Sequence, residues 1–234
     1  MNVLAIDTCL GAASAAVRWR GKDGTWKMRE AYEELSVGHA ERLMPMIAEV
    51  MAAAGLAFSD LDRIAATVGP GTFTGVRAGV AAARGLALAS GVPVAGATSL
   101  AVMAHRADAS LGAGRAGRLL AVAVDARRGM VYIQVFPRDP IGAAPAALLA
   151  PEAAARLIGN GPAIVVGSGA EAVALAVRAA GGEAEAALPD LQPNAASLAL
   201  MAPGLAPAEP FAPLYLRPPD VRPQNDKSLP RVAP

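Results

Sequence analysis

The residues with the clearest capacity for chemistry lie in a glycine-rich loop, Gly69-Pro70-Gly71-Thr72-Phe73-Thr74-Gly75. The loop follows a short apolar run predicted as a buried strand and leads into a long alanine-rich run predicted as a helix. Such a turn gathers free backbone N–H groups and the positive end of a helix dipole, which is the usual construction of a phosphate site. We therefore expect Gly69, Gly71 and Thr72 to line an anion site, with Thr74 as the helix cap. The alternative is a structural glycine-rich turn, since the spacing matches neither a P-loop nor a dinucleotide fingerprint.

Two aspartates stand where predicted strands end in hairpin turns. Asp7 and Thr8 follow the apolar strand that opens the chain, and Asp125 follows a second apolar strand. A carboxylate in such a turn can hold a metal–phosphate group, or it can accept hydrogen bonds from turn amides. Arg127 and Arg128 beside Asp125 suit either an anion or an internal ion pair. Because no residue stands out as a general base, we predict no catalytic residue.

Metal ligands are scarce in this chain. The two histidines, His39 and His105, lie far apart in the sequence, and no pair of carboxylates accompanies His105. A protein site needs about three ligands for a catalytic metal, so we predict no metal site. Cys9 is the only cysteine, which excludes a disulfide framework and favours the reducing cytoplasm, with Cys9 as a buried strand thiol.

The composition excludes several function classes. A formal net charge of +1 gives no electrostatic footprint for nucleic acid, so contact with tRNA would need a local patch or a basic partner. The longest apolar run is broken by Gly91 and Pro93, so no membrane span is expected. The chain opens directly into a strand pattern rather than a signal peptide.

The strand–aspartate–turn–strand plan of residues 3–19 recurs at 119–136. We therefore predict an α/β protein of two lobes built on one duplicated theme. The small, glycine-rich stretch 107–117 is the best candidate for the boundary between the lobes. The predicted organisation is an N-terminal lobe, a C-terminal lobe, a segment that returns to the N-terminal lobe and a flexible tail, at 1–106, 107–205, 206–217 and 218–234.

Two predicted helices carry regular stripes of apolar or small residues. In the first helix, residues 39–54, the stripe contains Leu43, Met46, Ile47 and Val50. In the second helix, small residues recur every four positions, at Gly75, Gly79, Ala83 and Ala87. Each stripe indicates either packing on the chain's own sheet or an interface with another subunit, and the pattern does not separate the two.

Several landmarks, taken in order, resemble one family. They are Leu4-Ala5-Ile6-Asp7-Thr8, His39-Ala40-Glu41-Arg42-Leu43-Met44-Pro45, the 69–79 loop, Asp125-Ala126-Arg127 followed by Val131-Tyr132, and Pro213-Leu214-Tyr215-Leu216-Arg217. Their order and spacing resemble the TsaB (YeaZ) family of bacterial tRNA threonylcarbamoyladenosine biosynthesis proteins over about residues 1 to 217. The glycine-rich loop is the most specific of these motifs.

This resemblance implies an actin/Hsp70-like (ASKHA) ATPase fold, with two lobes each built around a mixed sheet flanked by helices. It also implies a cytoplasmic complex with a catalytic paralogue, TsaD, and a small ATPase, TsaE. There a threonylcarbamoyl group passes from threonylcarbamoyl-AMP to N6 of adenosine 37 in tRNA, which this chain would meet only through the complex. Family members pair with TsaD, or as homodimers, through the N-terminal helices. That pairing places the interface on His39 and the two stripes.

The chain departs from TsaD-like relatives at one place. Those relatives hold a metal with a His-x-x-x-His pair just after the second helix, whereas residues 96–103 here contain no histidine. The resemblance therefore implies a non-catalytic subunit without a cofactor of its own, ATP or ADP being bound weakly or at the level of the complex. Asp7, Thr8, Gly69, Gly71, Thr72 and Asp125 would be remnants of a phosphate cleft. The alternative is a small ATPase or phosphotransferase of the same fold, with a magnesium–nucleotide between Asp7 and Asp125.

Overall fold

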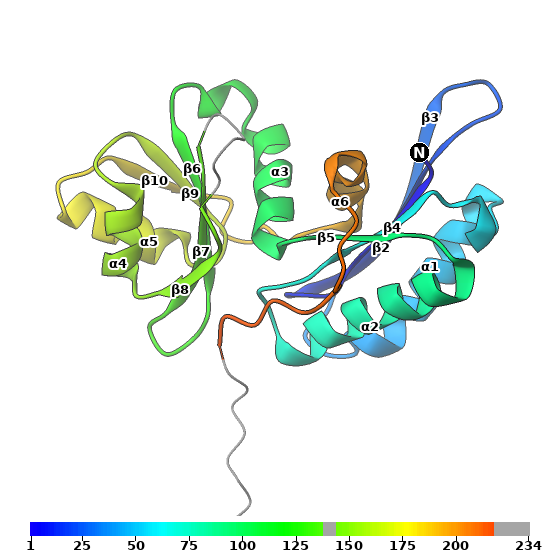
Figure 1. The fold of residues 1–234 in the computed structure, drawn as a ribbon. Helices are drawn as coiled ribbons and strands as arrows, with labels where there is room; N and C mark the ends of the chain where they lie inside the picture. Colours follow the sequence, from blue (N-terminus) through cyan, green and yellow to red (C-terminus); the bar gives the residue numbers. More distant parts are fainter. Residues whose placement is uncertain (138–143, 218–234) are drawn as a thin grey trace, which may run out of the picture.

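The computed structural model describes residues 1–137 and 144–217, which form two lobes side by side (Figure 1). The tail predicted at 218–234 lies outside the described residues. Within these residues, no helix is long and apolar enough to cross a bilayer.

A five-stranded mixed sheet forms the first lobe, in the order β3-β2-β1-β4-β5. Its strands are β1 (Val3–Asp7), β2 (Ala12–Arg20), β3 (Trp26–Glu34), β4 (Arg63–Thr67) and β5 (Val94–Ala97). The first three strands pair antiparallel, and β1, β4 and β5 pair parallel. Every residue of β1 is buried, because helices cover both faces of the sheet.

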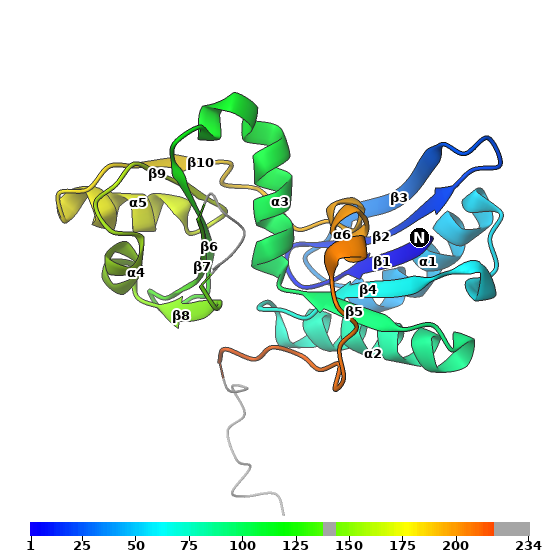
Figure 2. The same ribbon diagram turned by 45° about the horizontal axis from the view of Figure 1, so that its top comes forward.

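The two faces of this sheet are covered by different helices. On one face lie α1 (His39–Ala54) and α2 (Phe73–Ser90), whose apolar residues pack with Leu4, Ile6 and Ile64 in one core. On the other face lies α6 (Ala195–Met201), which packs on Val3 and Ala5 (Figure 2). Successive residues of β1 therefore face opposite sides of the sheet: Leu4 and Ile6 face α1 and α2, and Val3 and Ala5 face α6.

The second lobe repeats the plan of the first. Its sheet has the order β8-β7-β6-β9-β10, again with three antiparallel strands joined to two parallel ones. The strands are β6 (Leu119–Asp125), β7 (Val131–Phe136), β8 (Ala147–Leu149), β9 (Ala163–Val166) and β10 (Ala184–Ala187). The predicted duplication and the predicted α/β architecture of two mixed sheets are therefore confirmed.

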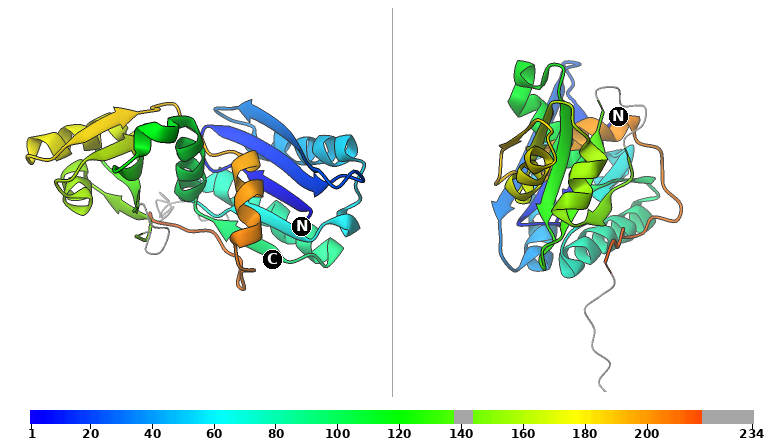
Figure 3. Two further views of the ribbon diagram at one scale, coloured as in Figure 1. Left: turned by 90° about the horizontal axis from the view of Figure 1, so that it is seen from above. Right: turned by 90° about the vertical axis from the view of Figure 1, so that its left-hand side faces the viewer.

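Three helices cover the second sheet. On one face lie α4 (Pro151–Ile158) and α5 (Ala170–Ala179), and on the other lies α3 (Ser99–Leu111). Because α3 also contacts α6 of the first lobe, it lies between the two lobes (Figures 2 and 3). The segment predicted as a glycine-rich boundary, 107–117, thus begins inside a helix.

Two parts of the chain after the second sheet return to the first lobe. α6 packs on β1 and β2, whereas the sequence-based division assigned residues up to 205 to the C-terminal lobe. Residues 206–217 then run along the first lobe, where Ala208 N donates to Val94 O at 3.0 Å and Leu214 N donates to Val68 O at 2.7 Å. Phe211, which is 6% exposed, anchors this segment in the core of the first lobe.

Candidate functional site

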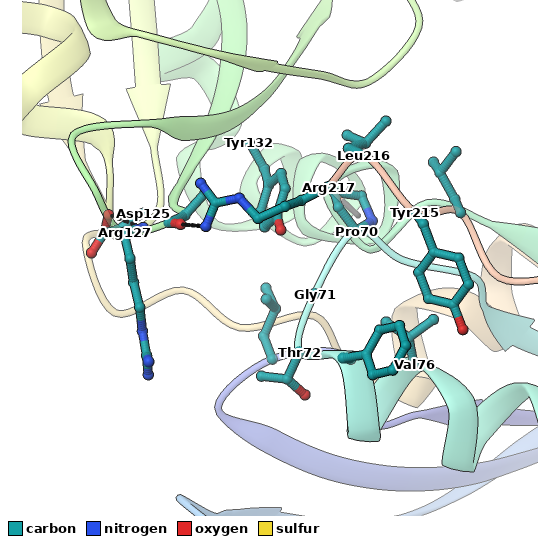
Figure 4. Close-up of a pocket in the computed structure, with 14 residues that line it drawn as sticks. Pro70, Gly71, Thr72, Val76, Asp125, Arg127, Tyr132, Tyr215, Leu216 and Arg217 are labelled. Atoms are coloured by element: carbon teal, nitrogen blue, oxygen red, sulfur yellow. Dashed lines mark hydrogen bonds between the residues drawn. The ribbon is translucent and has the colours of Figure 1, made fainter. Parts of the chain in front are cut away.

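A pocket of about 370 Å³ opens where the two lobes meet (Figure 4). From the first lobe it is lined by the glycine-rich loop and the start of α2, and from the second by the turn after β6. The C-terminal segment forms a further wall with Leu214, Tyr215, Leu216 and Arg217. Of the predicted cleft residues, Gly71, Thr72 and Asp125 line this pocket.

The glycine-rich loop packs directly on the turn between β1 and β2. Thr72 N donates to the carbonyl of Cys9 at 2.8 Å. A Cβ atom at Gly71 would collide with the same carbonyl, and one at Gly75 would collide with the carbonyl of Thr8. These glycines are therefore required by a close approach of two backbones. The loop occupies the space beside the β1–β2 turn. Gly71 and Gly75 are therefore part of a structural glycine-rich turn, the alternative to an anion site.

The cap of α2 is Thr72, and the prediction of Thr74 was wrong. The side chain of Thr72 accepts from Gly75 N at 3.1 Å, and its extended backbone is that of an N-cap residue. Thr74 lies exposed within the first turn of the helix. The loop contains two threonines, and the sequence alone does not show which of them directly precedes the first residue with helical φ and ψ angles.

Asp7 and Thr8 do not face the pocket, because both are fully buried. Asp7 Oδ1 accepts from Thr67 Oγ1 at 2.5 Å and from Cys9 N at 3.4 Å. Thr8 Oγ1 donates to Gly75 O at 2.6 Å, which ties β1 to α2. Both side chains thus make their hydrogen bonds inside the first lobe.

The interior around Asp7 changes the ionisation of two side chains. Burial raises the pKa of Asp7 from 3.8 to about 6, against the opposing effect of its hydrogen bond from Thr67. Asp7 Oδ2 is buried without a hydrogen-bond partner among the described residues. Burial, with the charge of Asp7 nearby, also raises the pKa of the Cys9 thiol, so Cys9 is an inert buried thiol, as predicted.

Asp125 lies where β6 enters the turn of the second hairpin, and it is exposed. Its Oδ1 accepts from Arg127 N at 2.8 Å, and its own N–H donates to Ser168 Oγ at 3.0 Å. Gly169 N donates to Ala123 O at 2.9 Å, so the turn at 167–169 packs on β6 as the first glycine-rich loop packs on β1. Asp125 is therefore a turn-stabilising acceptor that also reaches the pocket.

Aromatic rings and guanidinium groups missed by the sequence analysis surround the pocket. Arg77 lies 3.6 Å from the ring centre of Phe73, and its Nε donates to Tyr215 Oη at 3.0 Å. Arg217 Nη1 donates to the carbonyl of Ala126 at 2.7 Å, so the C-terminal segment touches the second lobe (Figure 4). These residues come from segments far apart in the chain, and no local pattern signals that they meet.

The histidines have separate surroundings. His39 begins α1, is 9% exposed, and its Nε2 lies 2.8 Å from the carbonyl oxygen of Leu10. His105 lies on α3. Within residues 1–137 and 144–217, no group of three or more His, Cys, Asp or Glu side chains could hold a metal ion.

The residues predicted for a partner interface lie on the inner faces of α1 and α2. His39 and the α1 stripe are at most 9% exposed, and the stripe belongs to the core of the first lobe. Gly75, Gly79 and Ala83 are buried as well, and Ala87 is half-buried against the same core. This placement corrects the prediction, because a side chain enclosed by its own sheet offers no surface to another chain.

The outer faces of the two helices carry a different set of residues. They are small, apolar or charged and include Ala40, Met44, Ala48 and Ala52 on α1 and Arg77, Ala81, Arg84, Gly85 and Leu88 on α2. Leu88 is 88% exposed and Met44 is 48% exposed. Within this outer face a Cβ atom at Gly85 would meet no atom within 4 Å.

Comparison with known proteins places these features in a family. The profile of TsaD, described as tRNA N6-adenosine threonylcarbamoyltransferase, matches residues 33–161. The tRNA threonylcarbamoyladenosine biosynthesis protein TsaB of Escherichia coli is 38% identical over 142 residues, which cover 61% of this chain and 58% of that protein. An uncharacterized protein of Mycobacterium tuberculosis is 35% identical over 225 residues, covering 95% of this chain and 94% of the relative.

A solved structure extends the match over both lobes. YeaZ from Pseudomonas aeruginosa superposes with a TM-score of 0.74 at 31% sequence identity, over 92% of this chain and 99% of that one. By contrast, the sequence match to the Escherichia coli protein spans only 58% of the relative's length.

Proposed function

The chain belongs to the TsaB (YeaZ) family, with the actin/Hsp70-like fold of two mixed sheets. On that premise we propose that it takes part in tRNA threonylcarbamoyladenosine biosynthesis as a non-catalytic subunit. In this role it binds and stabilises a TsaD-like paralogue, which transfers the threonylcarbamoyl group from threonylcarbamoyl-AMP to adenosine in tRNA.

The burial of Asp7 and Thr8 beneath the glycine-rich loop carries the non-catalytic part of this proposal. A carboxylate that positions a magnesium–phosphate group must reach the ligand, whereas Asp7 is 0% exposed and bonded to Thr67. Of the two hairpin aspartates, only Asp125 reaches the pocket. A chain with one such carboxylate lacks the paired arrangement that the alternative, an ATPase or phosphotransferase, requires.

The outer faces of α1 and α2 are the surface that we propose for the partner. They present small residues, which allow two helices to approach closely, together with the exposed apolar side chains of Met44 and Leu88. Covering such exposed apolar side chains with another chain would be favourable, because it removes apolar surface from water. A second copy of the chain would use the same face in a homodimer.

Gly85 and Gly79 provide a matched test of this surface. Gly85→Leu adds bulk where no atom lies within 4 Å, so the monomer should stay folded while the complex with a TsaD-like protein weakens at least tenfold. Gly79→Leu adds the same bulk on the inner face, where an added Cβ atom would lie only 2.7 Å from Thr8 Oγ1, so this variant should lose stability instead. Light scattering after size exclusion measures the complex, and circular dichroism measures the fold. Full partner affinity in folded Gly85→Leu and in Leu88→Asp would contradict the proposed surface.

A nucleotide titration distinguishes the proposed non-catalytic subunit from the alternative, an ATPase or phosphotransferase. We expect the isolated chain to bind no magnesium–ATP by calorimetry at concentrations at which its partner complex forms. Tight binding of magnesium–ATP, lost in Asp125→Asn, would favour the ATPase or phosphotransferase, which turnover of the bound ATP would then establish.

The proposal has four further parts. A TsaE-like ATPase joins the same complex, and tRNA is reached through the complex, because a net charge of +1 supplies no general attraction for nucleic acid. The chain holds no cofactor of its own. Its location is the cytoplasm, as the lone Cys9 led us to expect.

A further inference from the structure

The pocket between the lobes has no role in the partner surface proposed above. Its volume of about 370 Å³ lies within the range of sites for small molecules, roughly 300 to 1,000 Å³. The walls are mainly apolar and contain three aromatic rings, from Phe73, Tyr132 and Tyr215. A pocket of this size with apolar walls and a few polar groups suits a small organic ligand.

The charged groups of the pocket limit the charge of such a ligand. They are one carboxylate, Asp125, and two guanidinium groups, Arg127 and Arg217, so the lining carries +2 − 1 = +1. A single carboxylate on the ligand would balance this charge and could accept two parallel hydrogen bonds from a guanidinium group. A nucleoside triphosphate carries several more negative charges and needs a cation site, which the buried Asp7 cannot supply.

The backbone around Arg127 gives a second observation. Arg127 and Arg128 have φ angles of 62° and 55°, in the left-handed region that costs a non-glycine residue roughly 1–2 kcal/mol. Glycine or asparagine is the usual choice for a hairpin turn of this kind. The Arg127 side chain makes no hydrogen bond or ion pair with another described residue, although its backbone N–H donates to Asp125 Oδ1. Strain of this kind at the edge of a pocket points to a use for the side chain.

We propose that this pocket binds a small organic monocarboxylate with an aromatic or branched apolar body. The carboxylate lies against the guanidinium group of Arg127, and the apolar body lies against Val76, Tyr132 and Tyr215. A ligand held in this way contacts both lobes and the C-terminal segment (Figure 4). It would therefore stabilise the observed arrangement of the lobes. The inference does not rest on the proposed partner, because the outer face used for pairing lies on α1 and α2.

The test compares 3-phenylpropionate with its neutral analogue, 3-phenylpropanamide, by ligand-observed NMR and calorimetry on the full chain. We expect the carboxylate to bind with a Kd of about 1 mM, the affinity typical of a fragment of this size, and the amide to bind at least tenfold more weakly. Arg127→Gln should weaken the carboxylate about tenfold and leave the amide unchanged. Arg156→Gln removes an exposed arginine on α4, outside both the pocket and the proposed partner surface, and should change neither.

Arg127→Gly adds a readout that a structural role would not give. Glycine adopts the left-handed conformation without strain, so this variant should melt at the same or a higher temperature while binding of the carboxylate falls about tenfold. A lower melting temperature would assign Arg127 to the fold. Equal binding of acid and amide, no binding of either up to about 10 mM, or full binding by Arg127→Gln would each overturn the proposal. Partner binding by the same variants is measured separately and should stay normal.

Discussion

Asp7 shows how burial decides the role of a single residue. The same aspartate, at the end of the same strand, would be a phosphate-site ligand if the turn were open. Here the glycine-rich loop closes over it, so Oδ1 is bonded to Thr67 and the other carboxylate oxygen is unpartnered among the described residues. A charge without full compensation costs free energy in the interior. Asp7 is therefore expected to lower the stability of the lobe when it is ionised.

This cost predicts a pH-dependent difference between the protein and Asp7→Asn. The folded pKa of about 6 lies above the unfolded value of 3.8, so between these values the folded state binds more protons. Stability is therefore gained as pH falls through about 6 toward 4 and lost as pH rises, by about 3 kcal/mol in total. Asp7→Asn should remove this slope. Urea unfolding of both proteins at pH 4, 5, 6 and 7 gives the difference, and parallel curves would show that Asp7 does not titrate in this range.

The cap of α2 gives a prediction at the scale of one element. Thr72→Ala removes the side chain that accepts from Gly75 N, and we expect it to lower the free energy of unfolding by about 1 kcal/mol. Thr74→Ala is the matched control, since it replaces an exposed threonine in the first turn and should change stability by less than about 0.5 kcal/mol. Both values come from chemical denaturation. Equal effects would mean that Thr72 does not act as the cap.

The helices also show what the sequence could and could not predict. The period of the apolar residues predicted α1 from His39 to Ala54, because burial on one side imposes that period. The same period marks a stripe that faces the chain's own sheet and a stripe that faces a partner, so the predicted interface residues were placed on the wrong side. The predicted cleft residues Gly71, Thr72 and Asp125 do line the pocket. Its aromatic wall could not be predicted, because Phe73, Tyr132 and Tyr215 come together only through the arrangement of the lobes.

At the scale of the molecule, two elements tie the repeated sheets together. Helix α3 packs on the second sheet and contacts α6 on the first, and residues 206–217 run from β5 to the turn after β6. The duplication of the sheets was visible in the sequence as two similar hairpins. The return of residues 206–217 to the first lobe was also predicted, and the hydrogen bonds to β5 and Val68 agree with it. The position of α3 between the lobes was not predicted, because the pattern of one helix does not show which other elements it contacts. These two ties should make the two lobes unfold together.

Phe211 is the apolar anchor of the returning segment, so it tests this coupling. Its ring packs so closely on β5 that a Cβ atom at Gly96 would lie 2.9 Å from Phe211 Cε2. Phe211→Ala should lower the free energy of unfolding by about 3 kcal/mol, because it opens a cavity in the core of the first lobe. Tyr215→Ala, in the same segment but 44% exposed, should cost about 1 kcal/mol or less. Calorimetry of both variants should show one transition, since α3 still joins the lobes when the segment is weakened. Two separate transitions in Phe211→Ala would mean instead that residues 206–217, and not α3, couple the lobes.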